Sequence, residues 1–231
     1  MLVTKKMESR PYLTFRRYSL AALAAFNNIP PVALMEIEKT VAIKNYEKHQ
    51  SIFLEDDPAD SVWFVEKGLV KEIYHSAEGA DQTVSMTGPQ GMFGASAFEG
   101  GTYGYHAIAE TDASVLALPI QRLQETMERF PVLTHKVLSQ ISKLLRKAKD
   151  QHAYSHEKVE KRLIHTLLVW AEEYGKTLPL TRREIGAMAG TTTETCIRVF
   201  VQLEEAGWIA TTRGQLIIKN IDQLRKRMES L

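Results

Sequence analysis

The chain has 231 residues, 44% of them hydrophobic and 25% charged, an ordinary globular composition that allows one large domain or two smaller ones. Its formal net charge is +1. A net charge so close to zero argues against a broad polybasic surface, so any nucleic-acid contact must come from a local cluster of charge. The single cysteine, Cys196, excludes an intramolecular disulfide, a cysteine-ligated zinc site and a cysteine-ligated iron–sulfur cluster.

The N-terminal segment, residues 1–17, is polar and basic and is expected to be poorly ordered. The stretch YSLAALAAF that follows faintly matches a signal peptide. It is short and lacks a clear cleavage context, which favours an amphipathic or packing helix. No stretch approaches the ~20 apolar residues of a membrane span. We therefore expect a cytoplasmic protein, and the lone cysteine is consistent with a reducing compartment.

Between about Val41 and Pro119 the sequence is typical of many short strands. The strand-like segments are SIFLE, SVWFVEKGLVKEIYHS, DQTVSMTG, YHAIAET and ASVLALP. They are rich in β-branched or aromatic residues and are separated by Gly, Asp-Pro or Glu-Gly turn signals. This spacing predicts an antiparallel sandwich or barrel.

After Pro119 the pattern becomes helical. IQRLQETMERF predicts a short helix, and Pro131 suits the first turn of a second helix. Along that second helix apolar residues follow the a/d spacing of a coiled coil: Leu138, Ile141, Leu145, Ala148 and His152. The pattern covers barely two heptads, so a helix packed on its own barrel is the alternative to a dimer seam. A third helix carries Leu163, Leu167, Trp170 and Ala171 on its inner face, with Gly175 as its C-cap.

The stretch EIGAMAGTTTETCIRVF, from Glu184 to Phe200, predicts two short helices and a tight turn. TRRE at Thr181–Glu184 is a capping box that starts a helix at Arg182 and carries it to about Ala189. Gly190 supplies the turn, and the following TTTE caps a second helix through Thr191 or Thr192. This is a helix-turn-helix pattern. In it, Gly186 is expected where two closely crossing helices leave no room for a side chain.

The second helix of this motif has an inner and an outer face. The inward residues are Cys196, Val199, Phe200 and Leu203, and the outward residues are Thr193, Glu194, Ile197 and Arg198. Outward residues near the start of such a helix read base edges in the major groove. Glutamate accepts from cytosine N4, and arginine holds guanine O6 and N7. A solvated face with a local Glu194–Arg198 ion pair is the alternative. Inward-facing Cys196 is interpreted as a small core residue rather than a redox switch.

The segment GWIATTRGQLIIKN follows this helix and predicts a β-hairpin with Arg213 at its tip. A hairpin in this place makes a winged variant of the motif. Phosphate contacts are predicted for Thr181, Arg182, Thr192 and Arg213, together with amides at the helix N-termini. Such contacts fix the register on DNA without reading its sequence.

These residues resemble the cyclic AMP receptor protein and FNR (CRP/FNR) family of bacterial transcription regulators. LTRREIGAMAGTTTETCIRVFVQLEEAGWI fits the family's T-R-x-[ED]-I-G…G…E-T-x-x-R pattern, and FLEDDPADSVWFVEKGLVKEIY is similar to its barrel segment. The resemblance implies an α+β fold with an N-terminal antiparallel β-barrel of the cyclic-nucleotide-binding jelly-roll type, a long dimerisation helix and a C-terminal winged helix-turn-helix. The corresponding domains are residues 19–130, 131–155 and 156–231.

The resemblance also implies partners. They are a second copy of the chain, double-stranded DNA with a near-palindromic operator, RNA polymerase and an unknown small-molecule effector. By the motif match, Glu194 and Arg198 correspond to the family's base readers, and residues 131–152 form the dimer helix.

The effector region departs from the pattern of the cyclic AMP binders, G-E-[LI]…R-[ST]. Here it is GASAFEGGTYGYHAIAE, with Ala95 in place of the glutamate and Tyr103-Gly104 or Tyr105-His106 in place of Arg-Ser. Without the arginine the phosphate clamp is lost, so cyclic AMP is not expected to bind in the usual mode. The residues expected to line the effector pocket are Phe93, Gly94, Ala95, Ser96, Tyr103, Tyr105, His106 and Ala148.

The cofactor is not specified by the sequence. The iron–sulfur branch of the family needs several N-terminal cysteines, and the carbon-monoxide-sensing branch uses a histidine where Ser96 stands. Haem held by His75 or His106 stays open, although a lone strand histidine is more often structural. The alternatives to a DNA-binding regulator with an unidentified effector are a haem-based gas or nitric-oxide sensor of the same fold and a regulatory subunit of an enzyme or channel. No P-loop, nucleophile elbow or metal-spaced His/Glu set supports an enzyme.

Overall fold

The computed structural model covers residues 1–231 and describes residues 12–13, 20, 23–75, 81–212 and 214–231. These residues form two compact units, 1–143 and 144–231, and the division falls within the long helix α3 (Pro131–Tyr154). Tyr12–Leu13 forms strand β1, so the expectation of disorder over residues 1–17 is wrong at these two positions. Among the helices of the described ranges, none is both long and apolar enough to cross a membrane.

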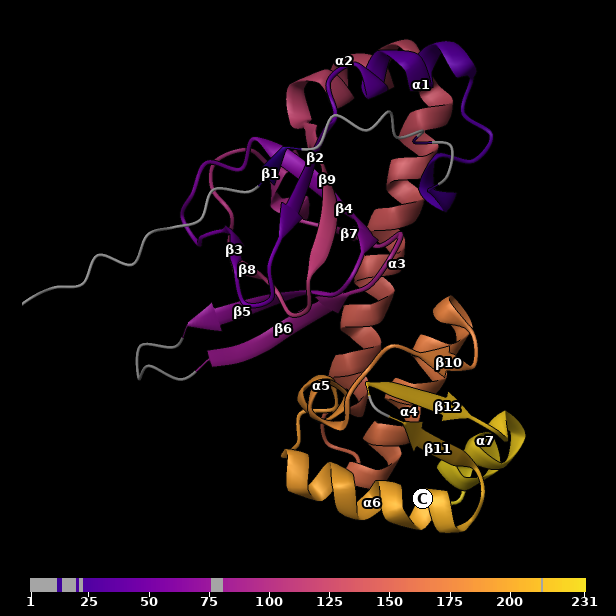
Figure 1. The fold of residues 1–231 in the computed structure, drawn as a ribbon. Helices are drawn as coiled ribbons and strands as arrows, with labels where there is room; N and C mark the ends of the chain where they lie inside the picture. Colours follow the sequence, from indigo (N-terminus) through magenta and orange to yellow (C-terminus); the bar gives the residue numbers. More distant parts are fainter. Residues whose placement is uncertain (1–11, 14–19, 21–22, 76–80, 213) are drawn as a thin grey trace, which may run out of the picture. The chain divides into compact units, whose positions relative to one another are not determined.

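The N-terminal unit is built on two antiparallel sheets (Figure 1). The five-stranded sheet has the order β1, β2 (Ala42–Tyr46), β9 (Ala113–Pro119), β4 (Ser61–Lys67) and β7 (Met92–Phe93). The four-stranded sheet has the order β3 (Ser51–Phe53), β8 (His106–Ala109), β5 (Val70–His75) and β6 (Asp81–Thr87). The predicted antiparallel β-sandwich or barrel between about Val41 and Pro119 is confirmed.

Both sheets contribute side chains to a shared aromatic core. Phe53 of β3 stacks on Tyr103 with ring centroids 3.7 Å apart, and Trp63 of β4 lies 6.1 Å from Phe93 of β7. These four rings are each at most 6% exposed. Aromatic pairs at such separations add to the stability that their buried area supplies. The protein's own aromatic side chains therefore occupy this part of the interior between the sheets.

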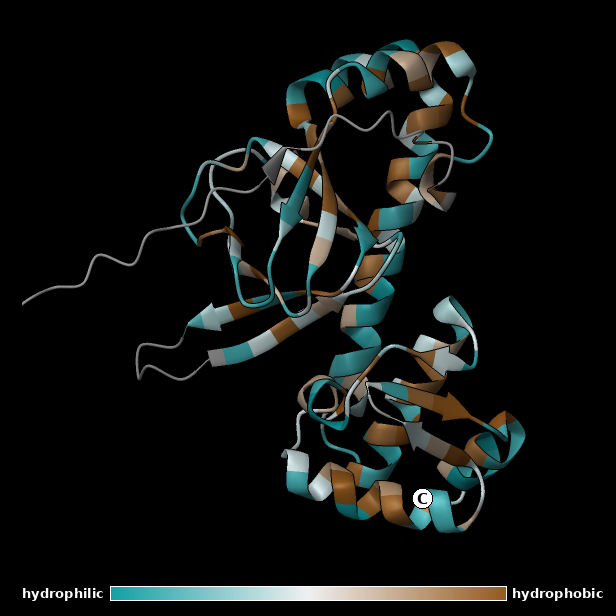
Figure 2. Ribbon diagram, in the orientation of Figure 1, coloured by the Kyte–Doolittle hydropathy of each residue, from teal (hydrophilic) through white to brown (hydrophobic). Residues whose placement is uncertain are grey.

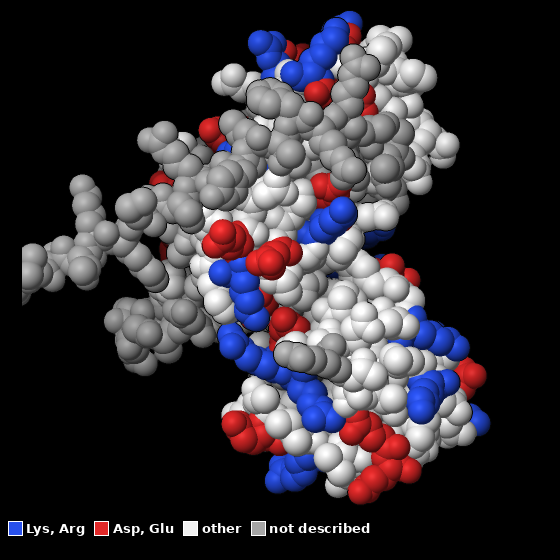
Figure 3. Space-filling view, viewed as in Figure 1, with Lys and Arg blue, Asp and Glu red and all other residues white. Residues whose placement is uncertain are grey.

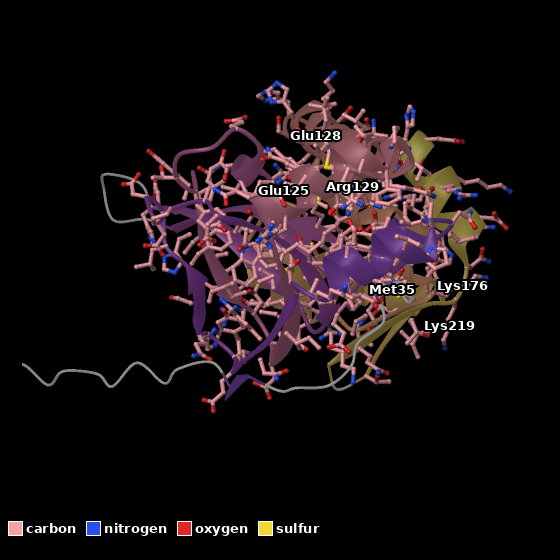
Figure 4. The ribbon with its side chains drawn as sticks, turned by 90° about the horizontal axis from the view of Figure 1, so that it is seen from above. Met35, Glu125, Glu128, Arg129, Lys176 and Lys219 are labelled. Carbon is pink, nitrogen blue, oxygen red and sulfur yellow. The ribbon has the colours of Figure 1, made fainter. Side chains whose placement is uncertain are left out.

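The other face of the five-stranded sheet is also covered. Strand β4 is buried over five consecutive residues, as expected for a strand packed on both faces. Its Phe64 contacts Phe26 of the short 3-10 helix η2 (Ala24–Phe26), with centroids 5.2 Å apart. Helices α1 (Pro31–Glu38) and α2 (Ile120–Arg129) are joined by an Arg129–Glu36 ion pair at 2.8 Å. Figure 4 labels Met35 on α1 and Arg129 on α2.

The C-terminal unit is a small α+β assembly around a three-stranded sheet of order β10-β12-β11. Its elements are α4 (Val159–Tyr174), β10 (Thr177–Leu178), α5 (Arg182–Met188), α6 (Thr193–Glu205), β11 (Ile209–Thr212), β12 (Gln215–Ile218) and α7 (Ile221–Glu229). Gly175 caps α4 with a φ of +80°, as predicted. The order of jelly-roll unit, long helix and winged helical unit agrees with the predicted fold class.

Helix α3 carries the predicted dimer seam. Leu133 and Val137 near its start are buried, whereas Leu138 and Leu145 are 53% and 55% exposed. Ile141 is half-buried, and Ala148 is exposed. Figure 2 shows hydrophobic and hydrophilic residues interleaved along this helix. An exposed apolar stripe of this kind is a surface that a second copy could cover.

Candidate nucleic-acid interface

The first helix of the motif begins as predicted. Thr181 is the N-cap of α5, its side chain accepts a hydrogen bond from the amide of Glu184, and the Glu184 carboxylate accepts one from the amide of Thr181. The helix ends at Met188, and Gly190 turns the chain with a φ of +61°. The capping box and the glycine turn are both confirmed.

The second helix, α6, is capped by Thr192. Its Oγ1 accepts a hydrogen bond from the amide of Thr195 at 3.2 Å. A capping box between Thr191 and Glu194, the first of the two options in the sequence, is therefore wrong. With Thr192 as the cap, Glu194 is the second residue of α6 and not the third, the position from which a capping-box side chain reaches back. Glu194 is exposed.

The packing at Gly186 differs from the expectation. A Cβ built on this residue would lie 3.4 Å from Cys196 Cβ and 3.4 Å from the carbonyl oxygens of Thr191 and Thr192. These separations are ordinary van der Waals contacts at their lower limit. The claim that the crossing leaves no room for a side chain is therefore wrong, because a methyl group fits.

The two faces of α6 are as the sequence predicts. The inward residues Cys196, Val199, Phe200 and Leu203 are all at most 9% exposed. On the outer face Glu194 and Arg198 are exposed, Ile197 is 39% exposed, and Thr193 is half-buried. Figure 1 shows α6, in orange, as a helix at the edge of its unit. The outer face therefore presents an acidic, a basic and an apolar side chain within little more than one helical turn.

Cys196 is fully buried against the motif. Burial raises the pKa of its thiol to about 12, and the nearby charge of Arg182 opposes that shift only in part. Since the thiolate is the reactive form, a buried thiol with so high a pKa is inert near neutral pH. This environment supports the interpretation of Cys196 as a core residue.

The four predicted phosphate contacts have different environments. Thr181 and Thr192 are exposed at the starts of α5 and α6, where they can donate to an anion. Arg213 lies outside the described residues. Thr212 of β11 pairs with Gln215 of β12. Gly214 has a φ of +76°, the left-handed conformation that such tight hairpins require.

Arg182 is committed to an internal contact. Its Nη2 lies 3.1 Å from each carboxylate oxygen of Glu204 on α6 and donates to Thr211 Oγ1 of β11 at 2.6 Å. Thr211 in turn donates to Glu204. The three side chains join α5, α6 and the hairpin. This geometry favours a structural role for Arg182 over the phosphate contact that the sequence predicts.

Arg162 on α4 is a functional candidate that the sequence did not reveal. Its Nη1 donates to the carbonyl of Ser155, directly after α3, at 3.0 Å, and its Nη2 donates to the carbonyl of Gly190 at 3.2 Å. One guanidinium therefore links the end of the long helix to the turn of the motif. No periodicity distinguishes this arginine from the other basic residues near it, because its partners are backbone carbonyls.

The charge pattern of the surface matches the composition. On the face shown in Figure 3, basic and acidic side chains are interspersed, and no area is uniformly basic. A DNA contact on this face would depend on a few well-placed groups rather than on a general positive field.

The predicted effector residues fall into two groups. Phe93 and Tyr103 are core residues, at 1% and 3% exposure. The Tyr103 hydroxyl donates to the carbonyl of Ser61 at 2.7 Å and accepts from Trp63 Nε1 at 2.9 Å. Gly94 has a φ of +67°, and a Cβ there would lie 2.9 Å from Trp63 Cδ1. These residues build the sandwich interior, so their side chains do not provide a ready polar clamp.

The second group is more accessible. Ala95 and Ser96, in the 3-10 helix η3 (Ala95–Phe98), are half-buried, and Tyr105 is 42% exposed. His106 is near Ser51 and His75 on the four-stranded sheet. Ala148 lies on α3, in the other unit, and is exposed.

Glu72 of β5 is an acidic neighbour of this region that the sequence analysis missed. Its carboxylate accepts hydrogen bonds from Ser85 Oγ at 2.6 Å and from the amide of Gly94 at 3.3 Å. Burial raises the pKa of Glu72 more than these two hydrogen bonds lower it. Within the described ranges, no group of three or more potential metal ligands is present.

Comparison with known protein families agrees with this architecture. The profile of the Crp-like helix-turn-helix domain matches residues 161–227, and the profile of the cyclic nucleotide-binding domain matches residues 43–130. Together the two matches cover more than half of the chain, and they fall on the C-terminal and N-terminal units respectively.

Individual relatives have low sequence identity to this chain, but the similarity extends over most of its length. The global nitrogen regulator of Synechocystis sp. is 25% identical over 190 residues, which are 77% of this chain and 84% of the relative. The CRP-like cAMP-activated global transcriptional regulator of Mycobacterium tuberculosis is 23% identical over 218 residues, 90% of this chain and 97% of the relative. The solved structure of FixK2 from Bradyrhizobium japonicum, at 25% identity, has a TM-score of 0.73 and covers 80% of this chain and 96% of that chain.

Proposed function

Because the chain belongs to the CRP/FNR family of DNA-binding transcription regulators, we propose that it acts as a homodimer that reads a near-palindromic operator through α6. The observation that carries this proposal is the outer face of α6. Glu194, Ile197 and Arg198 are exposed there, on a helix that follows a capped helix and a glycine turn. The protein would act in the cytoplasm, together with RNA polymerase.

The side chains on α6 have complementary chemistry toward base edges. Arg198 can donate two hydrogen bonds to guanine O6 and N7, and Glu194 can accept one from cytosine N4. Ile197 can contact only an apolar group such as the thymine methyl, and Thr193 is placed to contact either a base or the backbone. Arg198 is the fourth residue after Glu194, so the two lie about one turn apart and address neighbouring base pairs.

Phosphate contacts would hold this helix in register. Thr192 is exposed at the start of α6, where the unpaired amides of the first turn favour an anion. Thr181 presents a second hydroxyl at the start of α5. Arg182 is not proposed as a phosphate contact, because Glu204 and Thr211 hold its Nη2.

The dimer is supported by the exposed apolar stripe of α3. Leu138 and Leu145 are more than half exposed in the single chain, and Ile141 and Ala148 continue the same helical face. Pairing of two such helices would bring two copies of α6 to one operator. Two-fold symmetry then requires inverted half-sites, and in dimeric helix-turn-helix proteins such half-sites lie about one helical turn, roughly 34 Å, apart.

The effector of the barrel domain is inferred not to be cyclic AMP bound in the usual mode. Ala95 lacks the carboxylate, and neither candidate for the position of the clamp arginine, Tyr103 or Tyr105, is basic. The Tyr103 hydroxyl is also engaged by Ser61 and Trp63. A neutral, internally bonded phenol cannot replace the bidentate contact of a guanidinium with a phosphate. Calorimetric titration with cyclic AMP is expected to show no binding at micromolar concentration.

Selection of bound sequences from a randomised double-stranded DNA library tests the proposal. The expected result is enrichment of a motif with two inverted half-sites, bound by one dimer. Recovery of sequences without inverted symmetry, or no enrichment above the starting library, would overturn it. A protein that carries both Glu194→Ala and Arg198→Ala serves as the control and should enrich no motif.

A further inference from the structure

Two histidine rings face each other on the four-stranded sheet of the N-terminal unit. His75 Nε2, at the end of β5, lies 3.1 Å from His106 Nδ1, at the start of β8, and the rings meet edge to face with centroids 5.2 Å apart. β5 and β8 are paired antiparallel, and Ile73 of β5 is opposite His106. The two rings are therefore attached to regular strands, which limits how far they can separate.

A third side chain fixes the orientation of one ring. Ser51, on β3 at the other side of β8, has its Oγ 2.9 Å from His106 Nε2. If the serine oxygen accepts the Nε2 proton, the lone pair of Nδ1 is directed toward His75. Histidines that bind metals commonly donate their second ring N–H to an oxygen in this way, which fixes the tautomer and makes the ligand more basic.

The separation of the two nitrogens suits one metal ion bound by both. With metal–nitrogen bonds of about 2.0–2.1 Å, nitrogens 3.1 Å apart subtend about 100° at the ion. This angle lies between those of octahedral and tetrahedral coordination. Two axial ligands of one haem iron would instead lie on opposite sides of the metal and roughly 4 Å apart. The pair is thus arranged for chelation of a bare ion and not for a bis-histidine haem.

The pair is also accessible. His75 is exposed and His106 is half-buried, so an ion can reach the two nitrogens from solvent. Imidazole nitrogen is a good ligand for Zn²⁺, Ni²⁺ and Cu²⁺, whereas Mg²⁺ and Ca²⁺ prefer oxygen.

We propose that His75 and His106 form a two-nitrogen binding site for a divalent late transition metal ion of the Zn²⁺, Ni²⁺ and Cu²⁺ class. The ion takes the place of the proton that the two nitrogens share in a hydrogen bond, and His75 then carries its proton on Nδ1. Ser51 is the positioning residue of the site. This site is independent of the proposed DNA contact, so loss of one proposal leaves the other standing.

The site is tested by titrating the untagged, chelator-treated full chain with ZnCl₂ in a calorimeter. Binding of one Zn²⁺ per chain is expected, with a melting temperature that keeps rising as free Zn²⁺ exceeds the dissociation constant. His75→Ala and His106→Ala should each weaken Zn²⁺ binding at least about tenfold. His135→Ala removes an exposed histidine of α3 and should leave the affinity unchanged.

Ser51 provides a test that leaves both metal ligands in place. Ser51→Ala should weaken Zn²⁺ binding about 10-fold or more, because the orientation of the His106 ring is lost, and Ser51→Thr should restore it. Circular dichroism melting of each metal-free variant distinguishes loss of the site from loss of the fold. Absence of saturable Zn²⁺ binding in the wild type, or unchanged affinity in both histidine variants, would overturn the proposal.

Discussion

Arg162 donates a hydrogen bond from Nη2 to the carbonyl oxygen of Gly190 at 3.2 Å. Its second terminal nitrogen donates to Ser155, the residue after α3, at 3.0 Å. Gly190 is the turn of the helix-turn-helix, so the guanidinium bridges that turn and the end of the long helix. Hydrogen bonds that involve a charged group contribute about 1.5–3 kcal/mol to the stability of the folded state, more than hydrogen bonds between neutral groups. The bridge is therefore strong enough to influence how the turn is held.

Replacement of Arg162 is expected to weaken DNA binding without changing base preference. Arg162→Met removes both hydrogen bonds and should lower operator affinity roughly tenfold, equivalent to about 1.4 kcal/mol. Arg162→Lys keeps the charge but cannot span both carbonyls, so it should restore only part of the affinity. Binding to the selected operator and to single-base variants of it measures both properties.

Arg225→Met is the matched control for this experiment. Arg225 is in the same unit and has an exposed ion pair with Glu172 at 3.8 Å, which should contribute little. If Arg162→Met lowered the melting temperature but left operator affinity intact, Arg162 would stabilise the fold without positioning the turn.

A second prediction concerns Glu72 and pH. Burial raises the pKa of its carboxyl above the value of the unfolded chain. The folded state therefore holds this proton more tightly, and the resulting stability is complete below about pH 4 and is lost as pH rises through the folded pKa. Glu72→Gln should raise the melting temperature relative to wild type at pH 7, and this advantage should disappear toward pH 4.

Thermal denaturation at several pH values checks this sign. Glu99→Gln, at an exposed position, is the control and should follow the wild-type profile. A glutamine variant that is less stable than wild type at pH 7 would show that the hydrogen bonds from Ser85 and Gly94 favour the ionised form more than burial opposes it.

The elements that were predicted correctly from the sequence are determined by residues that lie close together along the chain. The capping box at Thr181–Glu184 and the turn at Gly190 depend on neighbours three or four residues away. Helices α1 and α7 were missed, because each is short and α1 contains Pro31 at its first position. Strand β2 was missed as well, since only one of its five residues is fully buried and the apolar alternation is weak.

The roles of long side chains were harder to predict, because they depend on contacts between distant parts of the chain. Arg182 pairs with Glu204, 22 residues away, and Arg162 with Gly190, 28 residues away. A basic residue near a helix start has the same sequence signature whether it faces a phosphate or a carboxylate. Tyr103 is similar, because its position in the motif does not show that its hydroxyl bonds to Ser61.

A third prediction compares the two glycines of the helix-turn-helix. Gly186→Ala places a methyl at ordinary contact distance and improves helix propensity by about 1 kcal/mol, so stability should be unchanged or slightly raised. Gly190→Ala places a residue with a Cβ at a φ of +61° and should lower the free energy of unfolding by about 1–2 kcal/mol. Urea denaturation measures both. A loss of more than about 2 kcal/mol in Gly186→Ala would show that Cys196 and the Thr191 and Thr192 carbonyls cannot yield.

A fourth prediction concerns the seam on α3. The double variant Ile141→Lys and Leu145→Lys places two charges on the apolar stripe and should give monomers by repulsion between copies. Ser142→Lys adds the same charge at an exposed position beside the seam and should remain dimeric. Sedimentation at several protein concentrations measures the association. Unchanged dimers in the double variant would locate the interface elsewhere on the chain.

The last prediction separates base readout from fold stability on the DNA-binding unit. Arg198 is exposed on α6, so Arg198→Ala should leave the melting temperature unchanged. The substitution should weaken the free energy of DNA binding by about 1–3 kcal/mol per half-site and relax the preference for one guanine. Ile197→Ala should modestly weaken one preference for an A·T pair, because only a methyl contact is lost.

Arg182→Ala is the contrasting variant, because its partners are Glu204 and Thr211 rather than solvent. It should lower the melting temperature and weaken binding to all sequences, while the slope of log affinity against log salt stays the same. A phosphate contact would reduce that slope by about one. Binding of each variant to a randomised operator library at two salt concentrations distinguishes these outcomes. If Arg198→Ala lost affinity uniformly and kept its base preferences, Arg198 would be a phosphate contact. The reading of guanine would then belong to another residue of α6 or of the hairpin.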